Sequence, residues 1–488
     1  MEVFIMKTWT AIERYQPYAH YSQHLLTKLE KQQQDSIWHL VYHIQPKSGL
    51  LNDPNGFSFF NNKWHLFYQS FPYGAVNGLR SWVHLTSTDL THWKHEKTSL
   101  LPDTQYETHG AYSGSALPMG DQLFLMYTGN VRTANWGRHA YQLGAWMNKE
   151  GDFYKLPTPL INQPLTNFTQ HFRDPKIIHH GNNYFAFLGA RRADDTGHVL
   201  VYKAPKVTGP WSYVDELHFG SSSLGYMIEC PNLVFINQHP VFIFCPQGLS
   251  KQKLSYENIY PNTYIVGDSF NWDTLTIVNP SSLHNFDSGF DLYATQAFNT
   301  ANGETYAIGW AGLPETKYPS DQENWQGSLS LVRKLSLQGT HLIQSPITTD
   351  LIDTSFDPIN ESLDLQEKVS FSFKHFPNGK LILQADHSDN RLTIFFDSTN
   401  ATVKVDRDKF GKKIGSKFGT TRTVKLTSKT KLDFTLYLDK SIFELYLNGG
   451  STALTGRYFP DQADTYHLDT SHLKSQKFDV QGWRLKSI

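Results

Sequence analysis

The sequence predicts an all-β protein: a five-bladed β-propeller followed by a C-terminal β-sandwich, with a short helical N-terminal extension. Between residues 38 and 347, five segments follow one plan of strand, polar turn and second strand. After residue 367, the chain changes to short strands in which apolar and polar residues alternate, as in a sandwich with solvated outer faces. Aromatic residues make up 14% of the chain, which also suits β structure.

The N-terminal extension comprises residues 1–37. Apolar residues recur at helical spacing between residues 11 and 34, so we expect helical structure that lies on the main domain. The start of the sequence has no long apolar run and no cleavage signature, and no stretch approaches a membrane span. We therefore expect a cytoplasmic protein with no membrane partner, in which Cys230 and Cys245 are reduced thiols of the core.

The propeller prediction covers residues 38–347. Its repeated second strands are residues 64–69, 123–127, 184–188, 241–245 and 305–310. Each follows a short polar turn rich in Asn and Gly, which is the chemistry of tight hairpins. Their spacing of roughly 60 residues suits a four-stranded blade with its loops. The alternative is a long all-β sandwich whose hairpins resemble one another by chance.

Residues 348–367 are predicted to form a linker, and residues 368–488 a β-sandwich. The sandwich carries no motif that indicates a binding site, and the sequence leaves the oligomeric state open. The formal net charge is -1. Because the chain has no basic excess, we expect no nucleic acid partner.

Three of the five repeats place a carboxylate at the start of the first strand. By repeat position, these strands begin near Asp53, Ser113, Asp174, Glu229 and Tyr293. Because the innermost strands of a propeller line its channel, these positions should face one axis. A channel wall has no structural need for three acids, which repel one another and are costly to bury. Their convergence therefore indicates a catalytic site.

The neighbours of each acid predict a role for it. Asp53 lies among amides and turn N–H groups, which favour an ionised nucleophile, and Arg173 should hold Asp174 ionised. Glu229 lies between apolar residues, where burial should raise its pKa, as suits a general acid. Two carboxylates in different environments are what glycoside hydrolysis requires. Further side chains at the same mouth should contact a sugar: Asn52, Gln69, Trp82, Tyr112, Ser113, Tyr293 and Trp310.

Several motifs resemble those of a known family. They are NDPNG at residues 52–56, LFYQ at 66–69, TSTDLTHW at 86–93, YSGSA at 112–116, YTGN at 127–130, FRDPK at 172–176, ECPNL at 229–233, DLYATQ at 291–296 and IGWAG at 308–312. By these motifs the chain is similar to the glycoside hydrolases of the invertase and fructanase family, family 32. The resemblance covers nearly the whole chain after residue 40.

The resemblance implies a five-bladed propeller with a β-sandwich, and a retaining β-fructofuranosidase that needs no metal or organic cofactor. The enzyme would cleave terminal β-D-fructofuranosyl bonds by double displacement. Asp53 would be the nucleophile and Glu229 the acid and base, while Asp174 would bind fructose hydroxyls and stabilise the transition state together with Arg173. The fructosyl pocket would be shaped by Asn52, Gln69, Ser113, Tyr293 and Trp310.

The expected substrate is a small sugar: sucrose, sucrose 6-phosphate or a short fructo-oligosaccharide. Residues 81–90 (SWVHLTSTDL) resemble the bacterial branch of the family that acts on sucrose 6-phosphate. A phosphate group needs cationic or N–H partners. The candidates in loops near the motifs are Arg80, Arg132, Arg138, Arg191 and Arg192.

Two other functions fit the same pattern of acids. A propeller arabinanase or xylosidase would also use three axial acids, although the residues around Asp53 and Glu229 disfavour it. A non-catalytic fructan-binding protein would have lost the nucleophile or the acid, and this chain retains both.

Overall fold

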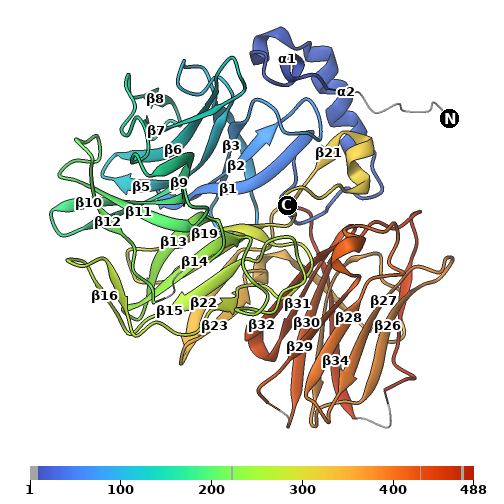
Figure 1. Cartoon of the computed structure of the whole chain (residues 1–488). Coiled ribbons are helices and arrows are strands. Elements are labelled where there is room, and N and C mark those ends of the chain that lie inside the picture. Colours follow the sequence, from blue (N-terminus) through green and yellow to red (C-terminus); the bar gives the residue numbers. More distant parts are fainter. Residues whose placement is uncertain (1–8, 221–223, 429, 474–476) are drawn as a thin grey trace.

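The structure is a computed structural model that describes residues 9–220, 224–428, 430–473 and 477–488. In these residues the chain is mostly β structure with short N-terminal helices, as predicted (Figure 1). The sheets of the first part, blue to yellow in Figure 1, lie beside the orange and red sheets of the second part. None of the described helices is long and apolar enough to cross a membrane. The predicted cytoplasmic location stays a prediction.

The N-terminal extension is helical in short pieces. Its described helices are α1 (Ala11–Arg14), η1 (Tyr18–His20) and α2 (Gln23–Gln34). The helical pattern of residues 11–34 is interrupted because Pro17 has no N–H to donate to a preceding turn. The extension is held to the first sheet by aromatic contacts, among which Tyr21 stacks on Tyr73 at 3.8 Å between ring centroids.

The described strands of the first part form five main sheets with antiparallel neighbours. The first contains β1 (Gly49–Phe60), β2 (Lys63–Phe71), β3 (Ser81–Ser87) and β4 (Lys94–Leu100). The second contains β5 (Ala111–Met119), β6 (Gln122–Arg132), β7 (Arg138–Met147) and β8 (Phe153–Lys155). The third contains β9 (Phe168–His180), β10 (Asn183–Arg192), β11 (Gly197–Ala204) and β12 (Ser212–Glu216).

The last two sheets follow the same order with small additions. The fourth contains β13 (Met227–Ile236), β14 (His239–Gln247), β15 (Thr263–Val266) and β18 (His284–Asn285), beside the hairpin of β16 (Ser269–Asn271) and β17 (Thr276–Val278). The fifth contains β19 (Tyr293–Asn299), β20 (Thr305–Trp310), β22 (Arg333–Gln338) and β23 (His341–Pro346). After the 3-10 helix η2 (Pro319–Glu323), β21 (Trp325–Gln326) pairs in parallel with the start of β1. The end of the first part is thereby joined to its beginning.

The first strands of the five sheets meet in a ring. Strand β1 packs against β5, β5 against β9, β9 against β13, β13 against β19, and β19 against β1. Apolar side chains fill the space between neighbouring sheets, and the last and first sheets share a cluster that includes Trp64, Tyr306 and Ile308. The ring brings together residues that lie far apart in the sequence.

Each first strand has a break in its pairing register at the same place. The breaks contain Asp53 in β1, Ser113 in β5 and Asp174 in β9, and they directly follow Glu229 in β13 and Tyr293 in β19. Two of these breaks contain a proline, Pro175 in β9 and Pro231 in β13, since proline cannot donate to the ladder. A bulge bends a strand and redirects its side chains. The breaks therefore mark the positions at which the sequence places its acids.

The second part consists of two sheets that face each other. The described strands of one sheet are β24 (Ile352–Phe356), β25 (Gln366–Phe373), β30 (Leu432–Asp439), β31 (Ile442–Leu447), β32 (Thr452–Arg457) and β34 (Phe478–Leu485). Those of the other are β26 (Gly379–Ala385), β27 (Arg391–Asp397), β28 (Thr402–Asp406), β29 (Thr421–Lys425) and β33 (Tyr466–Asp469). Strand β24 lies within the predicted linker and pairs with β34.

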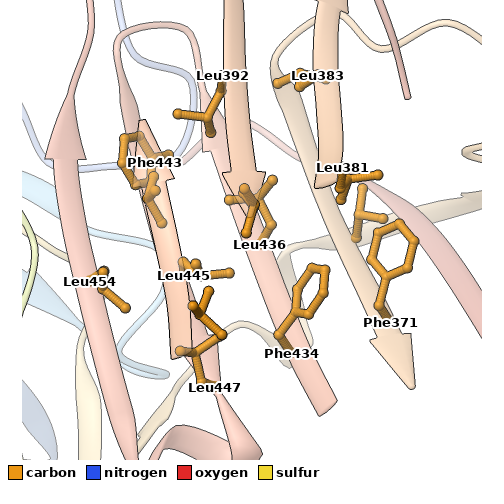
Figure 2. Close-up of a cluster of buried hydrophobic side chains, with 14 of the residues drawn as sticks. Phe371, Leu381, Leu383, Leu392, Phe434, Leu436, Phe443, Leu445, Leu447 and Leu454 are labelled. Atoms are coloured by element: carbon orange, nitrogen blue, oxygen red, sulfur yellow. The ribbon is translucent and has the colours of Figure 1, made fainter. Parts of the chain in front are cut away.

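One apolar core fills the space between these two sheets. Figure 2 shows side chains of both sheets in this core, including Phe371 and Phe434 from one sheet and Leu381 from the other. The alternation that predicted the strands is visible in β25, where every second residue is buried. The inward side chains of each sheet therefore have an apolar surface to pack on.

A buried network of charges joins the two parts. Arg333 donates to Asp287 at 3.0 Å and to Glu444 of the second part at 2.8 Å. His43 lies between two carboxylates, 2.9 Å from Asp439 and 3.2 Å from Glu444. All five side chains are almost completely buried. The network fixes the second part against the ring of sheets.

Candidate active site

The three predicted acids lie close enough to one another for their charges to interact. The pKa of Asp174 responds to Glu229 and to Asp53, and that of Asp53 responds to Glu229. Their strands β1, β9 and β13 belong to three different sheets of the ring. The register breaks thus bring together carboxylates that are separated by up to 176 residues, the difference between positions 229 and 53.

Asp53 is held by neutral donors. Ser113 donates to Oδ2 of Asp53 at 2.5 Å, and Asn52 donates from Nδ2 to Oδ1 at 3.0 Å. Gln69 lies 3.5 Å from Oδ2 and also contacts Ser113. Burial raises the pKa of Asp53, although the hydrogen bond from Ser113 and the charge of Arg80 oppose the rise. The carboxylate therefore has a fixed orientation, and it forms no ion pair with any residue that the structure describes.

Glu229 accepts hydrogen bonds on both of its oxygens. Arg173 donates to Oε1 from Nη2 at 2.6 Å and from Nε at 3.1 Å. The Tyr293 hydroxyl donates to Oε2 at 2.6 Å, and Gln247 donates to the same oxygen at 2.7 Å. Burial alone would raise the pKa of Glu229, but Arg173 and Tyr293 outweigh it and the pKa lies below its usual value.

Asp174 is the acid with the strongest tendency to hold a proton. It accepts a hydrogen bond from the backbone N–H of Cys230 at 3.0 Å, and its Oδ2 lies 4.0 Å from Nε of Arg173. Burial, with the charges of Glu229 and Asp53, raises the pKa of Asp174 to about 7 although Arg173 lowers it. The backbone at Asp174 has a φ of 63°, which is a strained conformation for this residue type.

The predicted pKa directions are wrong for all three acids. The sequence places Arg173 beside Asp174, but the guanidinium turns to Glu229 and stabilises its ionised form. Asp174 is left buried between two other carboxylates, and burial also raises the pKa of Asp53. The apolar neighbours of Glu229 in the sequence do not determine its pKa, because alternate residues of a strand point to opposite faces.

Some of the other predicted site residues contact the acids, and others lie beside or behind residues of the site. Tyr293 donates a hydrogen bond to Glu229. Trp310 lies on β20 opposite Tyr293, as the pairing partner of that residue. The ring of Tyr112 lies 4.9 Å from the guanidinium carbon of Arg80. Trp82 is 0% exposed and donates from Nε1 to the carbonyl of Tyr112 at 3.0 Å. The predicted sugar contact of Trp82 is therefore wrong: Trp82 lies behind the wall of the site, where it supports Tyr112.

Sequence reasoning missed one polar residue of the site and the contact of another. Gln247 ends β14 and contacts Glu229, just as Gln69 near the end of β2 lies beside Asp53. The repeat gave no signal for Gln247, because Gln69 lies opposite the break of β1 whereas Gln247 lies three residues beyond the residue opposite the break of β13. Arg80, named from the sequence only as a phosphate candidate, donates to Oε1 of Gln69 at 2.7 Å. This contact places a cation next to the Asp53 side of the site.

Two further points concern cysteines and metals. Cys230 and Cys245 are buried free thiols, as predicted, and burial raises the pKa of each. Among the described residues, no group of three or more His, Cys, Asp or Glu side chains could hold a metal ion.

Comparison with known families gives two matches that together span most of the chain. Residues 43–346 match the glycosyl hydrolases family 32 N-terminal domain, and residues 333–483 match the glycosyl hydrolases family 32 C terminal. The N-terminal extension lies outside both matches.

Two bacterial proteins are similar to this chain over nearly their full length. The chain is 44% identical over 460 residues to a sucrose-6-phosphate hydrolase of Pediococcus pentosaceus, covering 92% of each chain. It is 45% identical to a sucrose-6-phosphate hydrolase of Streptococcus mutans, covering 93% of this chain and 95% of the relative.

Solved structures give the same likeness. The sucrose-6-phosphate hydrolase of Lactobacillus gasseri superposes with a TM-score of 0.93 at 37% identity, covering 98% of this chain and 100% of that one. A mutant of the β-fructofuranosidase BmSUC1 of Bombyx mori, in complex with sucrose, gives a TM-score of 0.82 at 28% identity, with 95% and 97% covered. The predicted family is thereby confirmed: the chain belongs to glycosyl hydrolase family 32, as a β-fructofuranosidase of the kind found in bacterial sucrose-6-phosphate hydrolases.

Proposed function

We propose that this protein hydrolyses the terminal β-D-fructofuranosyl bond of sucrose and sucrose 6-phosphate by double displacement, with retention of configuration. The observation that carries the proposal is the placement of Asp53, Asp174 and Glu229 within or directly before the register breaks of three strands in one ring. In the described part of the chain, Asp53 forms no ion pair whereas Glu229 pairs with the guanidinium of Arg173, so the two carboxyl groups are suited to different steps.

Asp53 is the nucleophile in this mechanism. It attacks the anomeric carbon of the fructosyl unit, and the bond from that carbon to the leaving sugar breaks. Ser113 and Asn52 hold its two oxygens, so few rotamers are lost before attack. The product of this step is a fructosyl ester of Asp53, which water then hydrolyses.

Glu229 donates its proton to the leaving oxygen and later removes one from the attacking water. It must therefore carry a proton when the substrate binds, whereas its contact with Arg173 lowers its pKa. Arg173 lies 2.6 Å from Glu229 and 4.0 Å from Asp174. A shift of the guanidinium toward Asp174 would lower the pKa of Asp174 and raise that of Glu229, which moves the proton to the group that needs it.

The fold of the proposed enzyme is a five-bladed propeller over residues 38–347, a linker over 348–367 and a β-sandwich over 368–488. The closed cycle of contacts among β1, β5, β9, β13 and β19 supports the propeller. The common core of the two C-terminal sheets supports the sandwich. Asp174 and Arg173 would bind fructose hydroxyls on the channel axis.

The test removes the nucleophilic charge and keeps the shape of the side chain. Asp53→Asn should lower kcat for sucrose and for sucrose 6-phosphate by about four orders of magnitude, because no ester can form. Proton NMR of the wild type should show β-fructofuranose as the first product. Wild-type rates in a folded Asp53→Asn variant, or α-fructofuranose as the first product, would contradict the mechanism.

A further inference from the structure

Three arginines gather at one rim of the site without a carboxylate partner. Among the described residues, the side chains of Arg80, Arg132 and Arg138 form no ion pair, and the first two donate hydrogen bonds to neutral oxygens. Arg191 and Arg192 differ, since they pair with Asp195 and Glu216. The five arginines near the motifs thus fall into two that pair with a carboxylate and three that pair with none that the structure describes.

Arg132 and Arg138 face each other across the end of a hairpin. They are direct partners in the register of β6 and β7. Like charges directly opposite each other destabilise a strand pair. Arg132 donates to the carbonyl of Trp136 at 3.3 Å, and its Nε is buried without a partner. An anion bound between the two guanidinium groups would remove this repulsion.

The group of arginines reaches the catalytic acids. The guanidinium carbons of Arg80 and Arg138 lie 4.9 and 5.9 Å from the ring centroid of Tyr112, respectively. The charges of Arg138 and Glu229 each affect the pKa of the other. Burial, followed by the charge of Arg173, lowers the pKa of Arg138 to about 10. Arg138 therefore lies on the side of the site where Glu229 would protonate a leaving oxygen, while Arg80 lies nearer to Asp53.

The N-terminal extension closes this rim. The ring of Tyr15 lies 4.9 Å from that of His109 and 5.8 Å from that of Trp136. The backbone at Arg14 accepts a hydrogen bond from the N–H of Leu79 at 2.8 Å, directly before Arg80. Burial and the neighbouring Tyr112 raise the pKa of Tyr15, whereas Arg80 and Arg132 oppose the rise. A segment outside both family matches thereby supplies a wall beside the arginines.

We propose that Arg80, Arg132 and Arg138, walled by Tyr15 of the N-terminal extension, bind the phosphate group of a phosphorylated leaving sugar. This inference rests on the proposed function. Guanidinium groups match phosphate oxygens as paired donors, and three of them without carboxylate partners provide the charge that a phosphate dianion needs. The fructosyl unit binds at Asp53, so the phosphate belongs to the sugar that departs.

The experiment compares kcat/KM for sucrose 6-phosphate and for sucrose in matched variants. Arg132→Gln and Arg138→Gln should each lower the ratio of the two values by about tenfold or more, because each removes a charged hydrogen bond to the phosphate. Arg191→Gln, which alters a carboxylate-paired arginine at the end of β10, should leave the ratio unchanged within about twofold. Tyr15→Phe should lower the ratio by about threefold, through loss of its hydroxyl.

Product inhibition gives an independent readout. Glucose 6-phosphate should inhibit the wild type more strongly than glucose or inorganic phosphate, and Arg138→Gln should remove the difference between glucose 6-phosphate and glucose. An equal loss on both substrates in the Arg132 and Arg138 variants would overturn the inference and leave the proposed function standing. Equal kcat/KM values of the wild type for sucrose 6-phosphate and sucrose would also overturn the inference and leave the proposed function standing. Absence of fructose release from either substrate would instead overturn the proposed function.

Discussion

The buried charges at the active site and those at the contact between the two parts are balanced in different ways. Between the parts, Glu444 receives hydrogen bonds from Arg333, from His43 and from the backbone N–H of Leu331 at 2.6 Å. Its pKa is about 2, because Arg333 and His43 overcome the effect of burial. At the active site, burial raises the pKa values of Asp53 and Asp174, and the closest partner of Arg173 is Glu229.

The difference separates structural charges from chemical ones. A buried carboxylate that is fully paired stays ionised and holds two surfaces together. A buried carboxylate without a close cation tends to keep a proton, and that proton can move during a reaction. Both regions hold three buried carboxylates, and burial also raises the pKa of Asp287 at the contact between the parts. The distinction therefore lies between individual groups, with Glu444 closely paired and Asp53 and Asp174 not, and it does not lie in the number of acids.

Of the variants that test this comparison, the one that removes the proton donor should have the largest effect. Glu229→Gln should lower kcat for sucrose by about three orders of magnitude, since no group then protonates the leaving oxygen. A fructoside with an acidic phenol as leaving group needs no such protonation, so the first step of its reaction should be much less impaired. Burst kinetics with this substrate would measure that step. An equal loss for both substrates would mean that Glu229 does not act as the acid.

The next effect concerns the contact between the parts. Glu444→Gln should lower the free energy of unfolding by about 3–5 kcal/mol, because the buried cations Arg333 and His43 lose a charged partner. Urea unfolding would measure it. Asp195→Asn, which removes an exposed partner of Arg191, is the control and should cost about 1 kcal/mol or less. Similar losses in the two variants would remove the distinction between the clusters.

The smallest effect is a gain in stability at the active site. The pKa of Asp174 is raised to about 7, so its contribution to stability is present below its unfolded pKa and is lost as the pH rises toward 7. Asp174→Asn should therefore be more stable than the wild type at pH 7, by a free energy of about 2 kcal/mol, and nearly equal to it near pH 4. Glu444 has the opposite sign: its contribution is present above its unfolded pKa and is lost as the pH falls toward 2. Chemical denaturation of the variant and the wild type at both pH values would test this.

Local sequence predicted the hairpins and the positions of the acids. Asn61 and Asn62 form the two-residue turn between β1 and β2 with φ values of 49° and 58°, as their residue types favour. The family motifs predicted the chemistry of Asp53 and Glu229 without any coordinates. The family and its β-fructofuranosidase activity were therefore accessible from the sequence alone.

Contacts between distant residues were not accessible in this way. The sequence shows Arg173 next to Asp174, but side-chain direction on β9 determines that it binds Glu229, 56 residues away. Trp82 was assigned to the pocket by its repeat position, and only packing reveals that it lies behind Tyr112. The contact of His43 with Asp439 spans 396 residues, for which neither periodicity nor spacing gives a signal.

The register breaks of the five first strands have a consequence for how such a site can change. The same irregularity of the backbone occurs where the side chain is an acid and where it is Ser113 or Tyr293. The three acids nevertheless occupy different positions of the break: Asp53 is its second residue, Asp174 its first, and Glu229 the residue before it. Each first strand therefore offers three adjacent positions from which a side chain can reach the site. Sites of this kind can differ from sheet to sheet in which of these positions carries the functional group.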